Sequence, residues 1–281
     1  MNRRKFLKIM TAGFLTAAGG QAAYSTLIEP YRYDIVEQRI PLQRLGPGLD
    51  GLRAVQISDL HIGPWFTRNH LDRVVDLVGA QKADMVFITG DYLTRGGDRK
   101  HALAELYEPL RSLARDLPVF SVMGNHDFYE QADPPLRKML KEVGIVDVTN
   151  RMETYSRGGD VLHIAGIGTL MTGDMNLALV DAYVPKDSAA VLLAHEPDIA
   201  AYTSGLNKFG LQISGHSHGG QINLPLIGPI HLPEMGKRFP AGLYTLRNCL
   251  LYTNRGVGMT YIPIRMNCPP EITVFTFVAG A

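Results

Sequence analysis

The stretch Ala54-Val55-Gln56-Ile57-Ser58 runs directly into Asp59-Leu60-His61. A short, β-branched apolar run that ends in polar residues is typical of a buried strand followed by a turn. The same pattern recurs at four other places: residues 85–89 before Gly90-Asp91, 119–123 before Gly124-Asn125, 190–194 before His195, and 211–214 before Gly215-His216. The sequence therefore predicts five strands that each end in chemically functional side chains.

Helical patterns lie between several of these strands. Apolar residues recur three and four positions apart over 71–78 and over 103–113, as in helices that bury one face. Alternating strands and helices predict βαβ units and a largely parallel sheet, and thus an α/β fold. After Gly242 we expect antiparallel closing strands at 243–246, 250–253 and 272–277. Ligands of open α/β sheets gather beyond the carboxyl ends of strands, where all five polar clusters lie.

The composition is that of an ordinary globular protein. Of 281 residues, 46% are hydrophobic and 20% are charged, which excludes a disordered chain. The formal net charge of +1 provides no strong field for nucleic acid, so no nucleic-acid partner is expected. No linker or repeat interrupts residues 33–281, which we interpret as one domain. Cys249 and Cys268 are too few for a disulfide framework, and two small buried residues are favoured over a bridge.

Residues 1–28 have the pattern of an export signal. Arg3, Arg4, Lys5 and Lys8 stand without an acidic residue, and positions 9–28 carry no charge. The run from Arg3 to Lys8 resembles the twin-arginine signal. This implies export of the folded protein by the twin-arginine translocation machinery, to the periplasm or the outer face of the cytoplasmic membrane. Twenty residues are the minimum for a membrane-spanning helix, so residues 9–28 are either removed or kept as a membrane tether. The alternative is a basic amphipathic helix.

The polar clusters together predict a metal centre. Each alone is most often turn chemistry, but five in succession make that explanation poor. Nitrogen and oxygen donors without thiolate suit Mn, Fe, Zn, Co or Ni, whereas Mg and Ca prefer oxygen. Seven candidate ligands are too many for one ion and suit two ions with one bridging carboxylate: Asp59, His61, Asp91, Asn125, His195, His216 and His218. Two metals about 3.5–4 Å apart are typical of phosphoester hydrolysis. Of the five remaining histidines, His126 also lies in a polar cluster. The other four are expected to be solvated or satisfied in the core: His70, His101, His163 and His231.

The ordered motifs resemble those of the calcineurin-like metallophosphoesterases, in particular a small bacterial branch with a twin-arginine export signal. The motifs are Asp59-x-His61, Gly90-Asp91, Gly124-Asn125-His126-Asp127, His195 and Gly215-His216-Ser217-His218. The resemblance covers nearly the whole chain. It implies a four-layer α/β/β/α sandwich, and a metal-bridged hydroxide that attacks phosphorus in line.

The resemblance also implies a role for each residue. One metal ion would be held by Asp59, His61 and His218, and the other by Asn125, His195 and His216. Asp91 would bridge the two ions. His126 would contact the phosphoryl oxygen or protonate the leaving oxygen, and Asp127 would orient its other ring nitrogen.

Differences between these motifs and those of related enzymes narrow the class of substrate. Protein Ser/Thr phosphatases of this superfamily read G-D-x-x-D-R-G, but Thr94 stands at the second Asp position here, and Asp127 stands where those enzymes have Glu. A phosphodiesterase or pyrophosphohydrolase is therefore favoured over a protein phosphatase. Arg95 could reach a phosphate or cap a loop.

Export and nearby apolar residues (Trp65, Phe66 and 224–227) favour a cell-envelope substrate. Examples are a lipid-linked phosphodiester or, by analogy with relatives, a nucleotide lipid like UDP-2,3-diacylglucosamine. Core or loop packing explains Trp65 and Phe66 equally well. The alternative function is a catalytically silent metal-binding envelope protein of the same fold, although such a chain would be expected to lose Asp91 or His126. A metallopeptidase ranks last because H-E-x-x-H is absent.

Overall fold

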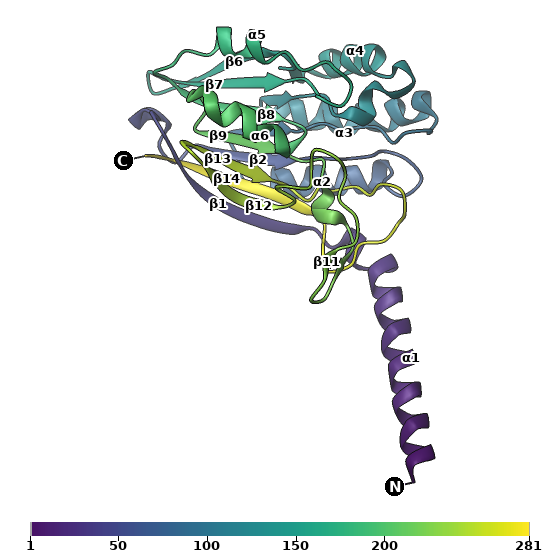
Figure 1. Cartoon of the computed structure of the whole chain (residues 1–281). Helices are drawn as coiled ribbons and strands as arrows, with labels where there is room; N and C mark the ends of the chain where they lie inside the picture. Colours follow the sequence, from purple (N-terminus) through teal and green to yellow (C-terminus); the bar gives the residue numbers. More distant parts are fainter. Residues whose placement is uncertain (1, 281) are drawn as a thin grey trace.

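Two six-stranded sheets pack face to face at the centre of the computed structural model, which describes residues 2–280 apart from the side chains of residues 9, 14, 130 and 131 (Figure 1). The strand order is β1-β14-β2-β3-β4-β5 in the first sheet and β12-β13-β9-β8-β7-β6 in the second. Strands β2 to β5 are parallel to one another, and so are β7, β8, β9 and β13. The predicted parallel core is therefore present in both sheets.

The strands of the first sheet are β1 (Asp34–Leu42), β2 (Arg53–Ile57), β3 (Met85–Ile88), β4 (Val119–Ser121), β5 (Val146–Asp147) and β14 (Glu271–Ala279). Those of the second are β6 (Arg151–Arg157), β7 (Asp160–Ile167), β8 (Ala189–Ala194), β9 (Leu211–Ser214), β12 (Gly242–Leu246) and β13 (Cys249–Thr253). The five strands predicted to end in polar clusters are all confirmed, as β2, β3, β4, β8 and β9.

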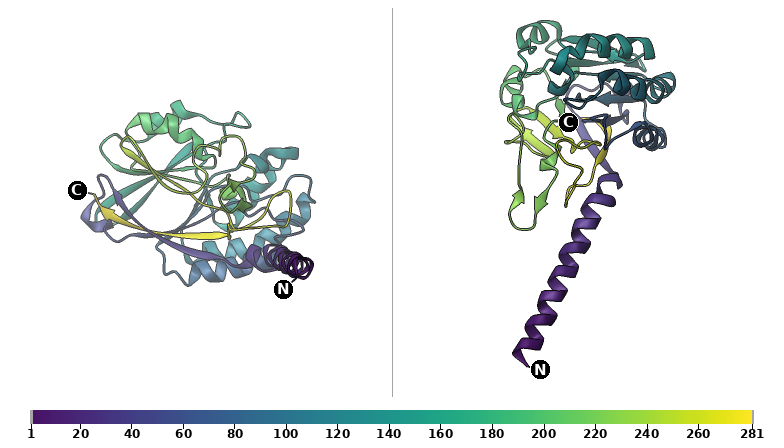
Figure 2. Two further views of the ribbon diagram at one scale, coloured as in Figure 1. Left: turned by 60° about the horizontal axis from the view of Figure 1, so that its bottom comes forward. Right: turned by 90° about the vertical axis from the view of Figure 1, so that its right-hand side faces the viewer.

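Helices cover the outer face of each sheet. The first sheet is covered by α2 (Arg68–Gly79), α3 (Arg99–Asp116) and α4 (Asp133–Val143), and the second by the shorter α5 (Leu177–Tyr183) and α6 (Ala200–Thr203). The two groups lie on opposite sides of the sheet pair (Figure 2). The two predicted helical patterns correspond to α2 and α3. These four layers confirm the expected α/β/β/α sandwich.

The sheets are joined by an apolar layer and by buried polar crosslinks, among them that of Gln56. Buried Phe87, Phe120 and Phe275 contribute to that layer, and each large apolar side chain removed from water contributes about 1.5–3 kcal/mol. Gln56 is fully buried, and its Nε2 donates to Thr89 Oγ1 (2.8 Å) and to Ser214 O of the opposite sheet (2.9 Å). The carboxyl ends of β2 and β9, which carry four of the predicted ligands, are thereby fixed relative to each other.

The expected antiparallel closing strands are only partly correct. β12 and β13 do pair antiparallel, but β13 also lies parallel to β9. β14 joins the other sheet, where it is antiparallel to β2 and parallel to β1. β14 is buried along most of its length, as expected of a strand that lies between two others. Cys249 and Cys268 are buried free thiols, as expected.

Helix α1 (Arg3–Leu27) projects from the sandwich, with most of its side chains exposed (Figures 1 and 2). Within residues 2–280, no helix combines the length and the apolar character needed to cross a membrane. The twin-arginine signal and the tether stay predictions from the sequence.

Candidate metal centre

The seven predicted ligands converge at one edge of the sandwich. Asp59 and His61 follow β2, Asp91 follows β3, and the remaining four follow β4, β8 and β9: Asn125, His195, His216 and His218. The carboxyl ends of parallel strands lie at a common edge of a sheet, so the polar clusters of both sheets lie in the same place. All seven side chains are buried.

Sharp turns direct these side chains inward. Five of the seven ligands have a positive φ, between 47° and 68°, which residues with a Cβ rarely adopt: Asp59, His61, Asp91, His216 and His218. Such conformations cost about 1–3 kcal/mol each and persist only where surrounding structure enforces them. Their concentration at one site indicates that the turns serve to position ligands.

Asp59, His61 and His218 form one group of possible metal ligands, with ligand atoms within 4.8 Å of one another. The Nε2 atoms of His61 and His218 are 3.1 Å apart, and His218 Nε2 lies 3.4 Å from Asp59 Oδ1. His61 Nδ1 donates to Leu93 O (3.2 Å), which leaves the lone pair of Nε2 directed at the site.

His195, His216 and Asn125 form a second group. His195 Nδ1 donates to Thr89 O (2.7 Å), so its Nε2 faces Asn125 Oδ1 (3.2 Å) and His216 Nδ1 (3.1 Å). His216 uses the opposite tautomer, because its Nε2 donates to Glu234 O (2.8 Å). Main-chain carbonyl groups therefore select which nitrogen each histidine offers.

Asp91 lies between the two groups. Its Oδ2 is 3.5 Å from His61 Nε2 and 3.2 Å from His195 Nε2, and its Oδ1 accepts the main-chain N–H of His126 (2.8 Å). Burial alone would raise the pKa of Asp91, but the positive charge of protonated His195 and His126 outweighs burial and holds that pKa well below its ordinary value. Burial would lower the pKa of His195, but the Asp91 carboxylate outweighs burial and holds that pKa well above its ordinary value, so His195 has to release a proton when it binds a metal ion. An ionised carboxylate placed between two sets of donors is what a bridging ligand requires.

The donor set fits divalent metal ions. Burial is the main cause that lowers the pKa of His61 to about 3, and burial together with His61 lowers the pKa of His218 well below its ordinary value. Both rings are therefore neutral at pH 7, as ligands must be. The lone pair of His61 Nε2 is directed at His218 Nε2, 3.1 Å away, a separation at which one cation can bind both nitrogens once His218 also offers its Nε2 lone pair.

Asp127 has a different role from the expected one. Its carboxylate accepts the main-chain N–H groups of Asp91 (3.0 Å), Tyr92 (2.9 Å), Leu93 (3.1 Å) and Gly124 (2.9 Å). The expectation that Asp127 orients His126 is therefore wrong, because both oxygens already hold the turn after β3. The turn contains Asp91, the residue expected to bridge the two ions, and the Leu93 carbonyl that orients His61.

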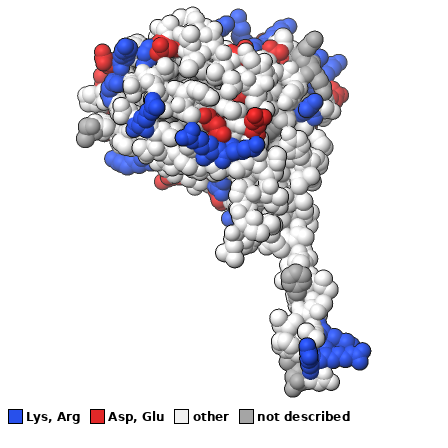
Figure 3. Space-filling model, in the orientation of Figure 1, with Lys and Arg blue, Asp and Glu red and all other residues white. Residues whose placement is uncertain are grey.

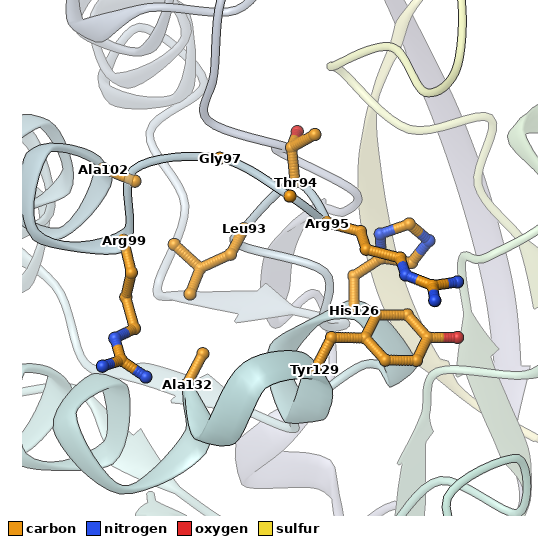
Figure 4. Close-up of a pocket in the computed structure, with 10 residues that line it drawn as sticks. Leu93, Thr94, Arg95, Gly97, Arg99, Ala102, His126, Tyr129 and Ala132 are labelled. Carbon is orange, nitrogen blue, oxygen red and sulfur yellow. The ribbon is translucent and has the colours of Figure 1, made fainter.

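His126 lies at the wall of the site. Its ring is half-buried, packs edge-on against His61 (4.8 Å between centroids), and has a buried Nδ1 without a hydrogen-bond partner among the described residues. Tyr129 and Arg95 lie beside it, with the guanidinium of Arg95 4.6 Å from the Tyr129 ring centroid (Figure 4). No sequence motif pointed to Tyr129.

A cavity of about 640 Å³ opens onto the centre. Beyond the candidate metal ligands, its walls are largely apolar and include Ile222, Ile230, Tyr261 and Ile262. His231 is exposed, as expected, but it also lines this cavity. Phe66 instead packs in the core beneath α2, in agreement with the packing alternative.

The chain belongs to the calcineurin-like phosphoesterase family, whose model matches residues 52–220. It is accordingly a metal-dependent phosphoester hydrolase of a family that uses two divalent metal ions.

Among individual proteins, it is 35% identical to the uncharacterized metallophosphoesterase YkuE of Bacillus subtilis strain 168, over 98% of this chain and 97% of that one. It is 27% identical to the phosphodiesterase YaeI of Escherichia coli strain K12, over 99% and 100%. The crystal structure of TT1561 of Thermus thermophilus shares the fold, with a TM-score of 0.50 at 12% identity over 73% of this chain and 90% of that one.

Replacing Asp127 with Ala tests its structural role. The substitution leaves four buried N–H donors unpaired, so we expect the free energy of unfolding of the metal-free chain to fall by about 3–5 kcal/mol in urea titration. His126→Ala is the matched control and should change that free energy by less than about 1 kcal/mol. Equal stability of the two variants would contradict the role assigned to Asp127.

Proposed function

We propose that this chain is a phosphodiesterase or pyrophosphohydrolase that acts on a cell-envelope substrate after export. The observation that carries the hydrolytic part is the convergence of Asp91 and six other donors, next to a half-buried His126 and an open cavity. When bound, two divalent ions would polarise the phosphoryl group and lower the pKa of a water molecule between them.

The residues of the chain position the reaction. Asp91 Oδ1 accepts the His126 main-chain N–H, so the residue proposed to bridge the ions also fixes the backbone from which the His126 ring extends. The ring lines the cavity, where we propose that it contacts the phosphoryl oxygen or donates a proton to the leaving oxygen. Burial of the candidate ligands holds their side chains in place, while the cavity leaves the centre open to substrate and water.

The cavity lining supports a diester over a monoester. Among the described residues, no Lys or Arg lines the cavity, although a dianionic monoester would be matched best by such side chains. The apolar wall instead suits a second ester substituent with apolar character. A lipid-linked phosphodiester, or a nucleotide lipid resembling UDP-2,3-diacylglucosamine, has both properties. The relative named a phosphodiesterase adds support for this choice.

Hydrolysis of two soluble substrates tests the proposal. With added Mn²⁺, we expect a higher kcat/KM for bis-p-nitrophenyl phosphate than for p-nitrophenyl phosphate, because the diester carries one charge less and a second apolar group. A clear preference for the monoester would contradict the diester assignment. Absence of turnover of both substrates would contradict the proposed function.

Replacing His126 with Ala tests its part in the reaction. We expect kcat for the diester to fall by roughly 10²–10⁴-fold, the usual contribution of a positioned acid or base. Elemental analysis should still find about two metal ions per chain, the number that two-metal hydrolytic sites hold. Loss of metal in this variant would instead make His126 a ligand, since one of its nitrogens lies within 4.8 Å of ligand atoms of His61 and Asp91.

Replacing Arg3 and Arg4 with Lys tests the export proposal. The charge of the segment is unchanged, but the arginine pair that the twin-arginine receptor reads is lost. We expect the variant to accumulate in the cytoplasm, as measured by fractionation and immunoblotting beside the unsubstituted chain. Export of the variant at the normal level would point to another pathway.

A further inference from the structure

The hairpin of β10 (Asn223–Leu224) and β11 (Gly228–Pro229) carries apolar side chains into solvent. At its tip Leu226 is fully exposed and Ile227 exposes 76% of its surface. Ile230, just after the hairpin, exposes 60%. The exposed tips of β-hairpins are ordinarily polar. This hairpin instead presents an apolar surface that the fold does not cover.

A second loop extends this surface. Tyr261 and Ile262 expose 72% and 43% of their surfaces. Gln221, at the base of the hairpin, donates its Nε2 to Thr260 O (3.2 Å) and to Ile262 O (3.0 Å), so the loop is fixed to the hairpin. We refer to the exposed apolar set as the apolar rim: Leu226, Ile227, Ile230, Tyr261 and Ile262.

The apolar rim is uncharged and lies on the same side of the molecule as α1. Residues 219–233 and 256–264 contain no Asp, Glu, Lys or Arg, and the projecting hairpin is free of charged side chains on the face shown in Figure 3. Figure 1 and the right-hand view of Figure 2 show the hairpin and α1 projecting from one side of the sandwich. Residues 9–27 of α1 are also uncharged, and its four basic residues suit anionic lipid head groups.

We propose that the apolar rim inserts into the surface of a lipid bilayer. A narrow hairpin tip is poorly shaped to bury the roughly 800 Å² per partner of a typical protein interface. A bilayer accepts a convex apolar surface of any outline, and charged residues around the insertion would oppose it. The absence of charge from both segments of the rim therefore favours lipid as the occupant.

Insertion would place the metal centre beside the lipid surface. Ile230, Tyr261 and Ile262 belong both to the apolar rim and to the cavity wall. A phosphoester linked to a lipid would thus reach the cavity without leaving the bilayer. This consequence rests on the proposed function, whereas binding of the rim to lipid does not.

Tryptophan substitution in the full-length, metal-loaded chain tests insertion directly. With phosphatidylglycerol vesicles that contain brominated acyl chains, we expect the indole introduced by Leu226→Trp to be strongly quenched, relative to the unsubstituted chain with its single Trp65. Val161→Trp is the matched control, because Val161 exposes 40% of its surface at the amino end of β7, away from the site. Its indole should not be quenched. An unquenched indole at position 226 on vesicle-bound chain would overturn the proposal, since α1 alone would then hold the protein there.

A second variant measures the strength of the contact. Leu226→Ser combined with Ile227→Ser should weaken vesicle binding at least about tenfold, because two apolar side chains no longer leave water. Val161→Ser should not weaken it, and equal thermal unfolding midpoints would verify the fold of both variants. Unchanged vesicle binding by the double variant would overturn the proposal. So would self-association in lipid-free sedimentation that the double variant abolishes, since the occupant would then be a second copy.

The two proposals fail separately. If the rim does not insert but soluble diester is hydrolysed, only the lipid contact is wrong. If the rim inserts but the diester is not hydrolysed, the proposed function is wrong and the lipid contact stands.

Discussion

The Asp91 carboxylate is the group on which the site depends. One of its oxygens lies between the imidazoles of His61 and His195, which come from different sheets, and the other accepts the His126 main-chain N–H. The turn that carries Asp91 is held by Asp127 through four main-chain N–H groups. Two buried carboxylates therefore have separate roles: Asp127 fixes the turn, and Asp91 joins the donor groups.

The site requires strained backbone at its candidate ligands and glycines where the chain passes close to a carboxylate. Strain lies in the five ligands with left-handed backbone, each of which lowers stability by about 1–3 kcal/mol. The apolar layer between the sheets and the Gln56 crosslink offset that cost. Gly124 and Gly215 allow close approach, because a Cβ at Gly124 would lie 2.2 Å from Asp91 Oδ1 and one at Gly215 would lie 2.3 Å from Asp59 Oδ2. The glycines of these motifs thus make room for the carboxylates.

Local patterns predicted the parts of the structure that depend on local sequence. Continuous apolar runs located β2, β3, β4, β8 and β9, because a strand buried on both faces has no polar alternation. β1 and β6 lie at sheet edges, and most of their residues are exposed or only partly buried. No continuous apolar run therefore marks them in the sequence. The place of β14 between β1 and β2 is set by pairing with distant strands, which periodicity does not encode. Similarly, Asp127 bonds to residues about 35 positions earlier in the chain, and Tyr261 reaches the cavity from a loop without a motif.

Electron paramagnetic resonance of the manganese-loaded protein tests the central claim most directly. If Asp91 bridges two ions, the protein binds two Mn²⁺ per chain, the number expected of a two-metal hydrolytic site, and their spectrum shows magnetic coupling. Asp91→Asn should weaken or abolish that coupling. A spectrum of isolated Mn²⁺ in the unsubstituted protein at full loading, or binding of a single ion, would contradict the account.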